Sequence, residues 1–115
     1  MEEVRLPNGE RADLGTKLEA YILNGRHPEG RHKARRFEST LGVTVDNAEV
    51  LRQALLGAAT RSDAAERRGD NGYGDVYVLR FALTTPRGTA TILSAWVILY
   101  AEDFPRLTTC YIVSP

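Results

Sequence analysis

The segment from Arg26 to Arg36 concentrates the side chains most able to do chemistry. It holds both histidines of the chain and a single acid, Glu29, and its basic residues are Arg26, Arg31, Lys33, Arg35 and Arg36. The whole chain is neutral, with 15 Lys and Arg against 15 Asp and Glu. The cluster is therefore a local positive field, which attracts phosphate or carboxylate groups.

His27 is the candidate general base or acid of this segment, because histidine exchanges protons near neutral pH. Pro28 suits the first turn of a helix, whose free N–H groups would point back toward His27 and hold an anion there. Lys33, three residues before Arg36, shares a helix face with it. The predicted phosphate- or RNA-binding residues are Arg31, His32, Arg35 and Arg36. A proton carrier beside such cations suits metal-independent RNA cleavage through the 2′-hydroxyl.

The alternative interpretation needs no chemistry. The basic residues would then be the solvated face of an amphipathic helix, and His27 would cap the turn before it.

A second group of hydroxyls lies in the apolar series near the end of the chain. Thr109 and Tyr111 share one face of a predicted strand, whereas Thr108 and Cys110 share the other. The pattern does not show which face is buried, and threonine and tyrosine are also good strand formers. Cys110, the single cysteine, is expected to be a buried and inert thiol.

The elements that must position these residues follow from hydrophobic periodicity. Three helices are predicted, over residues 14–25 with Asp13 as N-cap, from Pro28 to Gly42, and over 46–58 behind a capping-box-like start. Period two then predicts strands over 76–84, 89–100 and 107–113, the first two joined by a turn at 85–88. A fourth strand over 59–66 is an option, although that segment also suits a frayed helix.

These elements predict one α+β domain over residues 1–115, with helices followed by a three- to four-stranded antiparallel meander. It divides into a flexible arm or short edge strand (1–12), a helical half (13–58) and the sheet (75–115). The strand over 92–100 is so apolar that it must be covered on both faces or lie at an interface, which is compatible with a homodimer.

Composition also bears on the cellular location of the protein and on whether it binds a metal or cofactor. No secretory signal and no run of about 18 apolar residues is visible, which predicts a cytoplasmic protein without membrane contact. The spacing of two histidines and one cysteine does not match a zinc site, so we expect no metal and no cofactor.

Several motifs resemble a family of small, uncharacterised bacterial domains. The shared pattern is Lys…Tyr-x-Leu, His-Pro-x-Gly-x-x-Lys-Ala-x-x-Phe and Leu-Gly, which this chain carries as 17–23, 27–37 and 41–42. The likeness continues through Tyr73-Gly74 and the strand around Trp96 to Thr109-x-Tyr111. The His-Pro-x-Gly-x-x-Lys-Ala segment is its most specific part.

The family's helices-then-sheet layout resembles the metal-independent ribonuclease fold of barnase, the EndoU nucleases, the tRNA-cutting colicins and the RelE toxins. That resemblance implies a toxin or phage-associated nuclease, with catalytic His27, Lys33, Thr109 and Tyr111 meeting in one cleft. Its partners would be RNA and a cognate immunity or antitoxin protein. The alternatives are a non-catalytic module that holds an anionic partner at the basic helix start, and a toxin-associated accessory protein.

Overall fold

The chain forms an α+β fold, as the sequence predicts. The computed structural model describes residues 4–113. Its two α-helices are α1 (Arg31–Leu41) and α2 (Glu49–Arg61), and its short helices are η1 (Gly9–Arg11), η2 (Leu18–Ile22) and η3 (Val45–Asn47). The strands that follow are β1 (Glu66–Asp70), β2 (Gly74–Thr85), β3 (Gly88–Leu99) and β4 (Arg106–Ile112).

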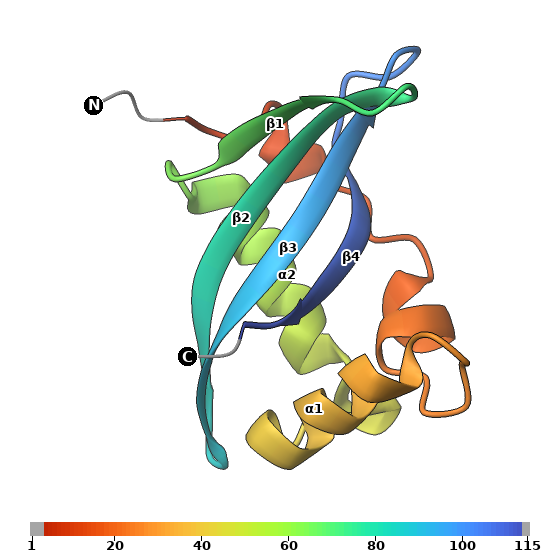
Figure 1. Cartoon of the computed structure of the whole chain (residues 1–115). Helices are drawn as coiled ribbons and strands as arrows, with labels where there is room; N and C mark the ends of the chain where they lie inside the picture. The colour runs from red at the N-terminus through yellow and green to blue at the C-terminus, as the bar shows by residue number, and fades with distance from the viewer. Residues whose placement is uncertain (1–3, 114–115) are drawn as a thin grey trace.

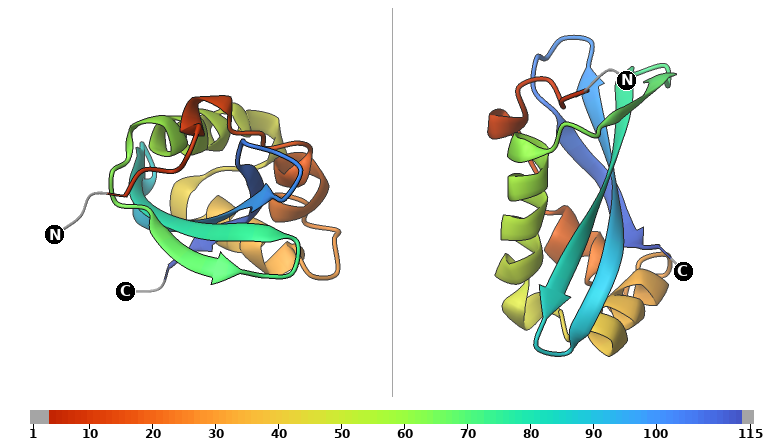
Figure 2. Two further views of the ribbon diagram at one scale, coloured as in Figure 1. Left: turned by 90° about the horizontal axis from the view of Figure 1, so that it is seen from above. Right: turned by 90° about the vertical axis from the view of Figure 1, so that its left-hand side faces the viewer.

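The four strands form one antiparallel meander in the order β1-β2-β3-β4 (Figure 1). Figure 2 shows α2 running along one side of this sheet, and α1 beside the end of the β2–β3 hairpin. The core lies between the sheet and the helices, and its largest fully buried side chains include Trp96, Phe37, Leu18, Ile22, Leu51 and Leu55. Alternate residues of β2 and β3 therefore line the core, which explains the period-two pattern.

Two predicted elements differ from the structure. Of the helix predicted over 14–25, only the π-helical turn Leu18–Ile22 forms, since Gly15 has a left-handed φ of 54° just before it. The fourth strand is Glu66–Asp70 and not 59–66, because α2 continues to Arg61. The charged composition of β1 hides it from hydrophobic periodicity, and as an edge strand it has no buried face to reveal it.

The ends of the helices are set by glycine and by side-chain hydrogen bonds. Gly42 ends α1 in the left-handed region, with a φ of 70°, as predicted. The capping box lies earlier than expected: Thr44 and Asn47 exchange hydrogen bonds around η3, and the predicted box at residues 46–49 does not form. The Thr85 hydroxyl donates to the Leu41 carbonyl oxygen at 2.8 Å, which ties the end of α1 to the β2–β3 turn.

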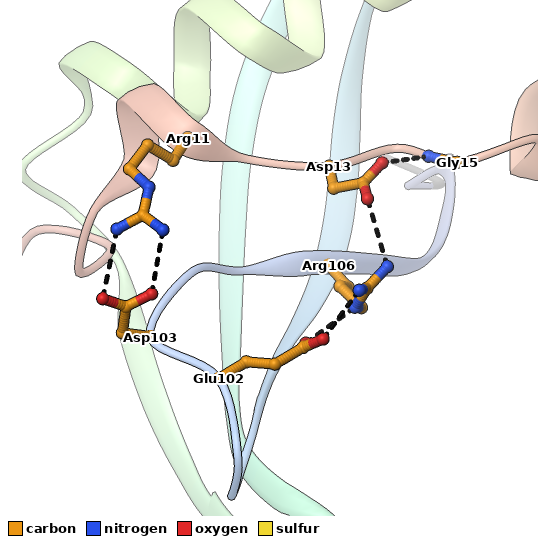
Figure 3. A network of polar contacts seen from close by, with 6 residues as sticks. All are labelled: Arg11, Asp13, Gly15, Glu102, Asp103 and Arg106. Atoms are coloured by element: carbon orange, nitrogen blue, oxygen red, sulfur yellow. Dashed lines mark hydrogen bonds and ion pairs between the residues drawn. The ribbon is translucent and has the colours of Figure 1, made fainter.

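The segment before η2 is tied to the connection between β3 and β4 (Figure 3). The Arg106 guanidinium contacts Glu102 through two hydrogen bonds of 2.7 Å and Asp13 at 3.1 Å. Arg11 pairs with Asp103 at 3.0 Å. The Asp13 backbone also bonds to both Pro105 and Leu107, so this segment begins a parallel pairing along β4.

The other face of the sheet is apolar too. Its side chains include Val76, Val78, Leu93, Ala95 and Val97, which alternate with the core residues. A homodimer through this face stays a prediction. Among the described residues, no helix is long and apolar enough to cross a bilayer.

We predict that Ser94→Ala lowers the free energy of unfolding by about 1–3 kcal/mol. Ser94 and Trp96 are fully buried, and the indole N–H donates to the Ser94 hydroxyl at 2.9 Å. The substitution leaves that N–H without its acceptor. Urea unfolding followed by the fluorescence of the single tryptophan measures the change. The exposed Ser39→Ala should stay within about 0.5 kcal/mol of the parent, and equal stability of the two variants would contradict the prediction.

We also predict that Arg106→Gln makes stability less dependent on acid pH. The hydrogen bonds from Arg106 lower the pKa of Glu102, so this carboxylate stabilises the fold at neutral pH and loses that effect as pH falls through its folded-state pKa. Unfolding free energies between about pH 7 and pH 3 should fall less steeply in the variant. Arg35→Gln is the control and should keep the parent slope. Equal slopes in parent and Arg106→Gln would refute the assignment.

Candidate functional site

Helix α1 and strand β4 border an open hollow of about 590 Å³. Its lining residues are Tyr21, His32, Lys33, Arg36, Thr108, Thr109, Tyr111 and Ile112. Three of the four predicted catalytic residues, Lys33, Thr109 and Tyr111, are thus brought together, with two of the predicted phosphate-binding residues, His32 and Arg36. None of the lining residues is acidic, so the hollow has a positive wall from α1 and a hydroxyl-bearing wall from β4.

Tyr21 is the residue around which this site is arranged. The Lys33 ammonium donates a hydrogen bond of 2.9 Å to the Tyr21 hydroxyl and lies 5.0 Å from the centre of its ring. The His27 ring meets the same tyrosine edge-on, with ring centres 4.8 Å apart. Since the phenolic oxygen accepts from Lys33, its own proton is free to point elsewhere.

His27 lies on the far side of Tyr21. It lines an adjoining hollow of about 530 Å³, which shares Tyr21 with the first and also contains Asp13, Glu29 and Arg106. The structure therefore separates His27 from the cleft in which the resemblance expects it.

The His27 ring caps the turn before α1. Its Nδ1 accepts hydrogen bonds of 3.0 Å from the backbone N–H groups of both Glu29 and Gly30. The neutral ring therefore carries its proton on Nε2, where it can donate but not accept. Helix α1 starts at Arg31 and not at Pro28 as predicted. The backbone N–H groups of Glu29 and Gly30, in the turn before the helix, donate to the His27 imidazole. These two N–H groups therefore do not form the predicted anion site.

Arg31 and Arg35 lie on another side of α1. They line a hollow of about 230 Å³ together with Leu23, Thr44 and Val45. The four basic residues of α1 therefore line two different hollows, because the helix directs Arg31 and Arg35 to one side and Lys33 and Arg36 to another.

A bulge in β4 determines how its side chains point. Ala95 pairs with Thr109 but the next residue of β3, Trp96, pairs with Leu107, so Thr108 is an extra residue. Thr109 and Tyr111 point to the same face, as predicted. Thr108 is exposed and does not share the buried face of Cys110.

The Thr109 hydroxyl oxygen is buried and has no hydrogen-bond partner among residues 4–113. An unpaired buried hydroxyl is unfavourable by about 1–3 kcal/mol. This group would therefore gain from a ligand atom or a water that reached it.

A family model described as a domain of unknown function, DUF6883, matches residues 5–114. The chain belongs to the DUF6883 family. No curated protein and no solved structure matches it. A domain family of unknown function agrees with the prediction of an uncharacterised family, whereas the family motif and the likeness to ribonucleases stay predictions.

The role of Tyr21 in this DUF6883 domain is not visible in the sequence pattern. Tyr21 occupies an apolar position in the predicted first helix, and the residue it bonds, Lys33, is 12 positions away. Only the packing of η2 against α1 brings them together. Within the described part of the chain, no group of three or more His, Cys, Asp or Glu side chains could hold a metal ion.

We predict that Cys110 of this DUF6883 domain is unreactive in the native state. Burial raises the pKa of its thiol to about 12, although Lys33 acts weakly in the opposite direction. The nucleophilic thiolate is therefore scarce near neutral pH. Labelling with a disulfide reagent at pH 8 should be at least about a hundredfold slower than in urea. Comparable rates in both conditions would show that the thiol is accessible.

Proposed function

We propose that this protein is a metal-independent ribonuclease whose active site is the hollow between α1 and β4. The observation that carries the proposal is the meeting of Lys33 and Arg36 with Tyr111 and Thr109 around one open space. These groups come from segments far apart in the sequence. A volume of about 590 Å³ suits a ligand of nucleotide size.

Four of the lining residues have direct parts in the proposed reaction: His32, Tyr111, Lys33 and Arg36. The 2′-hydroxyl oxygen attacks phosphorus while the bond from phosphorus to the 5′ oxygen breaks, leaving a 2′,3′-cyclic phosphate. His32 accepts the 2′-hydroxyl proton, and Tyr111 donates one to the leaving oxygen. Lys33 and Arg36 stabilise the charge that develops on phosphate, a contribution of about 2.7–4 kcal/mol for one preorganised donor.

His27 has an orienting role in this proposal. The sequence predicts it as the general base or acid, but its Nδ1 accepts from two N–H groups and it lines the adjoining hollow. His32 takes its place because it lines the hollow itself. His27 then positions the Tyr21 ring, which in turn holds the Lys33 ammonium.

Thr109 is proposed to bind the phosphate. Rotation of its side chain would bring the hydroxyl into the hollow, where it would gain the hydrogen bond that it lacks.

The second candidate function is a module that binds an anionic partner without catalysis. Two observations favour it: His27 is committed to capping the turn, and the chain has no net charge. Binders of nucleic acid backbones usually carry a clear excess of positive charge. The same hollow would then hold a carboxylate or phosphate group of a partner. A toxin-associated accessory role is a form of this second candidate.

We predict that the purified protein cleaves total bacterial RNA in the presence of EDTA. His32→Ala and Lys33→Met should each lower the rate by at least about a hundredfold, because they remove the base and a phosphate ligand. Arg35→Gln is the matched control, since it removes one charge from another side of the same helix, and it should cleave like the parent.

His27→Asn tests the orienting role. The amide oxygen can still accept the N–H groups of the turn, so the variant should fold and lose less activity than His32→Ala. Cleavage by all variants at the parent rate would remove this hollow from the mechanism. Intact RNA with the parent protein would leave the binding module as the better function.

A further inference from the structure

We propose that the adjoining hollow, lined by Tyr21, His27 and Glu29, binds the guanine base of a nucleotide whose phosphate lies in the hollow between α1 and β4. The inference deepens the proposed function, because it names the substrate as single-stranded RNA cut after guanosine. It rests on that function only for the position of the phosphate.

The adjoining hollow has the size and the walls that a planar base needs. Its volume is about 530 Å³, and its apolar part comes from Leu14, Ala20 and Leu107. The rings of Tyr21 and His27 meet there at an angle of 76°, with centres 4.8 Å apart. Two rings at this angle form a corner, in which a flat base can stack on one ring and meet the edge of the other. Apolar walls with a few polar groups are typical of sites for small organic ligands.

His27 supplies a hydrogen-bond donor to this hollow. Its Nδ1 accepts from the backbone N–H groups of Glu29 and Gly30, so the neutral ring carries its proton on Nε2. Among the residues that the structure describes, none accepts a hydrogen bond from Nε2. The turn fixes the ring, and the Nε2–H is therefore a preorganised donor for a carbonyl oxygen such as O6 of guanine.

Glu29 supplies the acceptor. The other carboxylate of this hollow, that of Asp13, already accepts from the Gly15 N–H at 2.8 Å and from Arg106 at 3.1 Å (Figure 3). Within residues 4–113, no hydrogen bond or ion pair engages the Glu29 carboxylate, whose side chain is exposed. The two oxygens of one carboxylate can accept from two adjacent N–H donors at once.

Guanine is the base that matches one donor beside a carboxylate. Its pairing edge carries the O6 acceptor next to two donors, N1–H and the 2-amino group. Adenine has no carbonyl oxygen, and cytosine and uracil each have one donor group on the same edge. A guanine bound by this edge cannot be paired in a duplex, so the ligand must be single-stranded.

Tyr21 connects the base with the phosphate, because it lines both hollows. Its hydroxyl accepts from the Lys33 ammonium at 2.9 Å. A guanosine held beside Tyr21 would therefore direct its ribose and 3′ phosphate toward Lys33 and Arg36.

The test is an NMR titration of the full-length, 15N-labelled protein with the four nucleoside 3′-monophosphates. The guanosine nucleotide should bind at least about tenfold more tightly than the other three and shift the Gly15 and Glu29 amide signals. The inosine nucleotide, which lacks the 2-amino group, should bind several-fold more weakly than the guanosine nucleotide. Glu29→Gln should remove the preference for guanosine over adenosine, whereas the exposed Glu38→Gln, on the same side of the sequence cluster, should keep it.

Equal affinity for the four nucleotides, no binding at millimolar concentration, or an unchanged preference in Glu29→Gln would overturn the inference. Glu29 is exposed, so its substitution should not prevent folding. The outcome is separable from that of the proposed function. A guanosine preference in a protein that leaves RNA intact would remove the ribonuclease and keep the base site, whereas RNA cleavage with equal nucleotide affinities would do the reverse.

Discussion

The position of α1 depends on one close contact, between the backbone of Gly30 and the backbone of Tyr21. A Cβ atom at Gly30 would lie 2.0 Å from the Tyr21 carbonyl oxygen, so only glycine permits the approach. The same tyrosine then contacts His27 through its ring edge and Lys33 through its hydroxyl. The position of Lys33 opposite β4 depends on this anchoring, although Gly30 and His27 themselves lie outside the lining of the hollow.

The chain is neutral as a whole, but several of its acids are paired with cations away from the hollow. Asp103 pairs with Arg11, Asp75 with Arg67, and both Asp13 and Glu102 with Arg106. Lys33 and Arg36 of α1 face the hollow, which has no acid in its lining. Screening at physiological salt limits such fields to about 8 Å, so the distant acids have little effect on a ligand in the hollow.

Sequence reasoning was most successful where one face of an element is buried. The ends of the β2–β3 hairpin and of β4 were predicted to within a few residues. In these strands, buried core residues such as Trp96 occupy every second position, which gives a clear two-residue period in the sequence. It failed for β1, where an exposed edge needs no apolar residue, and for the first helix, which Gly15 interrupts.

For the site, the meeting of Lys33 with Thr109 and Tyr111 was predicted, but the separation of the other candidate residues was not. The sequence does not show to which side each cation points until the start of the helix is known. The predicted start was Pro28, whereas α1 begins at Arg31. The separation of Arg31 and Arg35 from Lys33, and of His27 from the hollow, depends on tertiary packing around Tyr21. The bulge at Thr108 is likewise invisible in the sequence, since threonine suits a regular strand equally well.

The contact between Asp13 and Arg106 has a consequence for how the molecule folds. The two residues are 93 positions apart, whereas the β2–β3 hairpin closes through a turn between Thr85 and Gly88. The loss of chain entropy on closing a loop grows with its length, so the hairpin can form early and the contact with Asp13 late. We therefore expect residues 12–17 to dock after the transition state, with φ-values near zero at Asp13, and to be the first part to detach when the native protein opens locally.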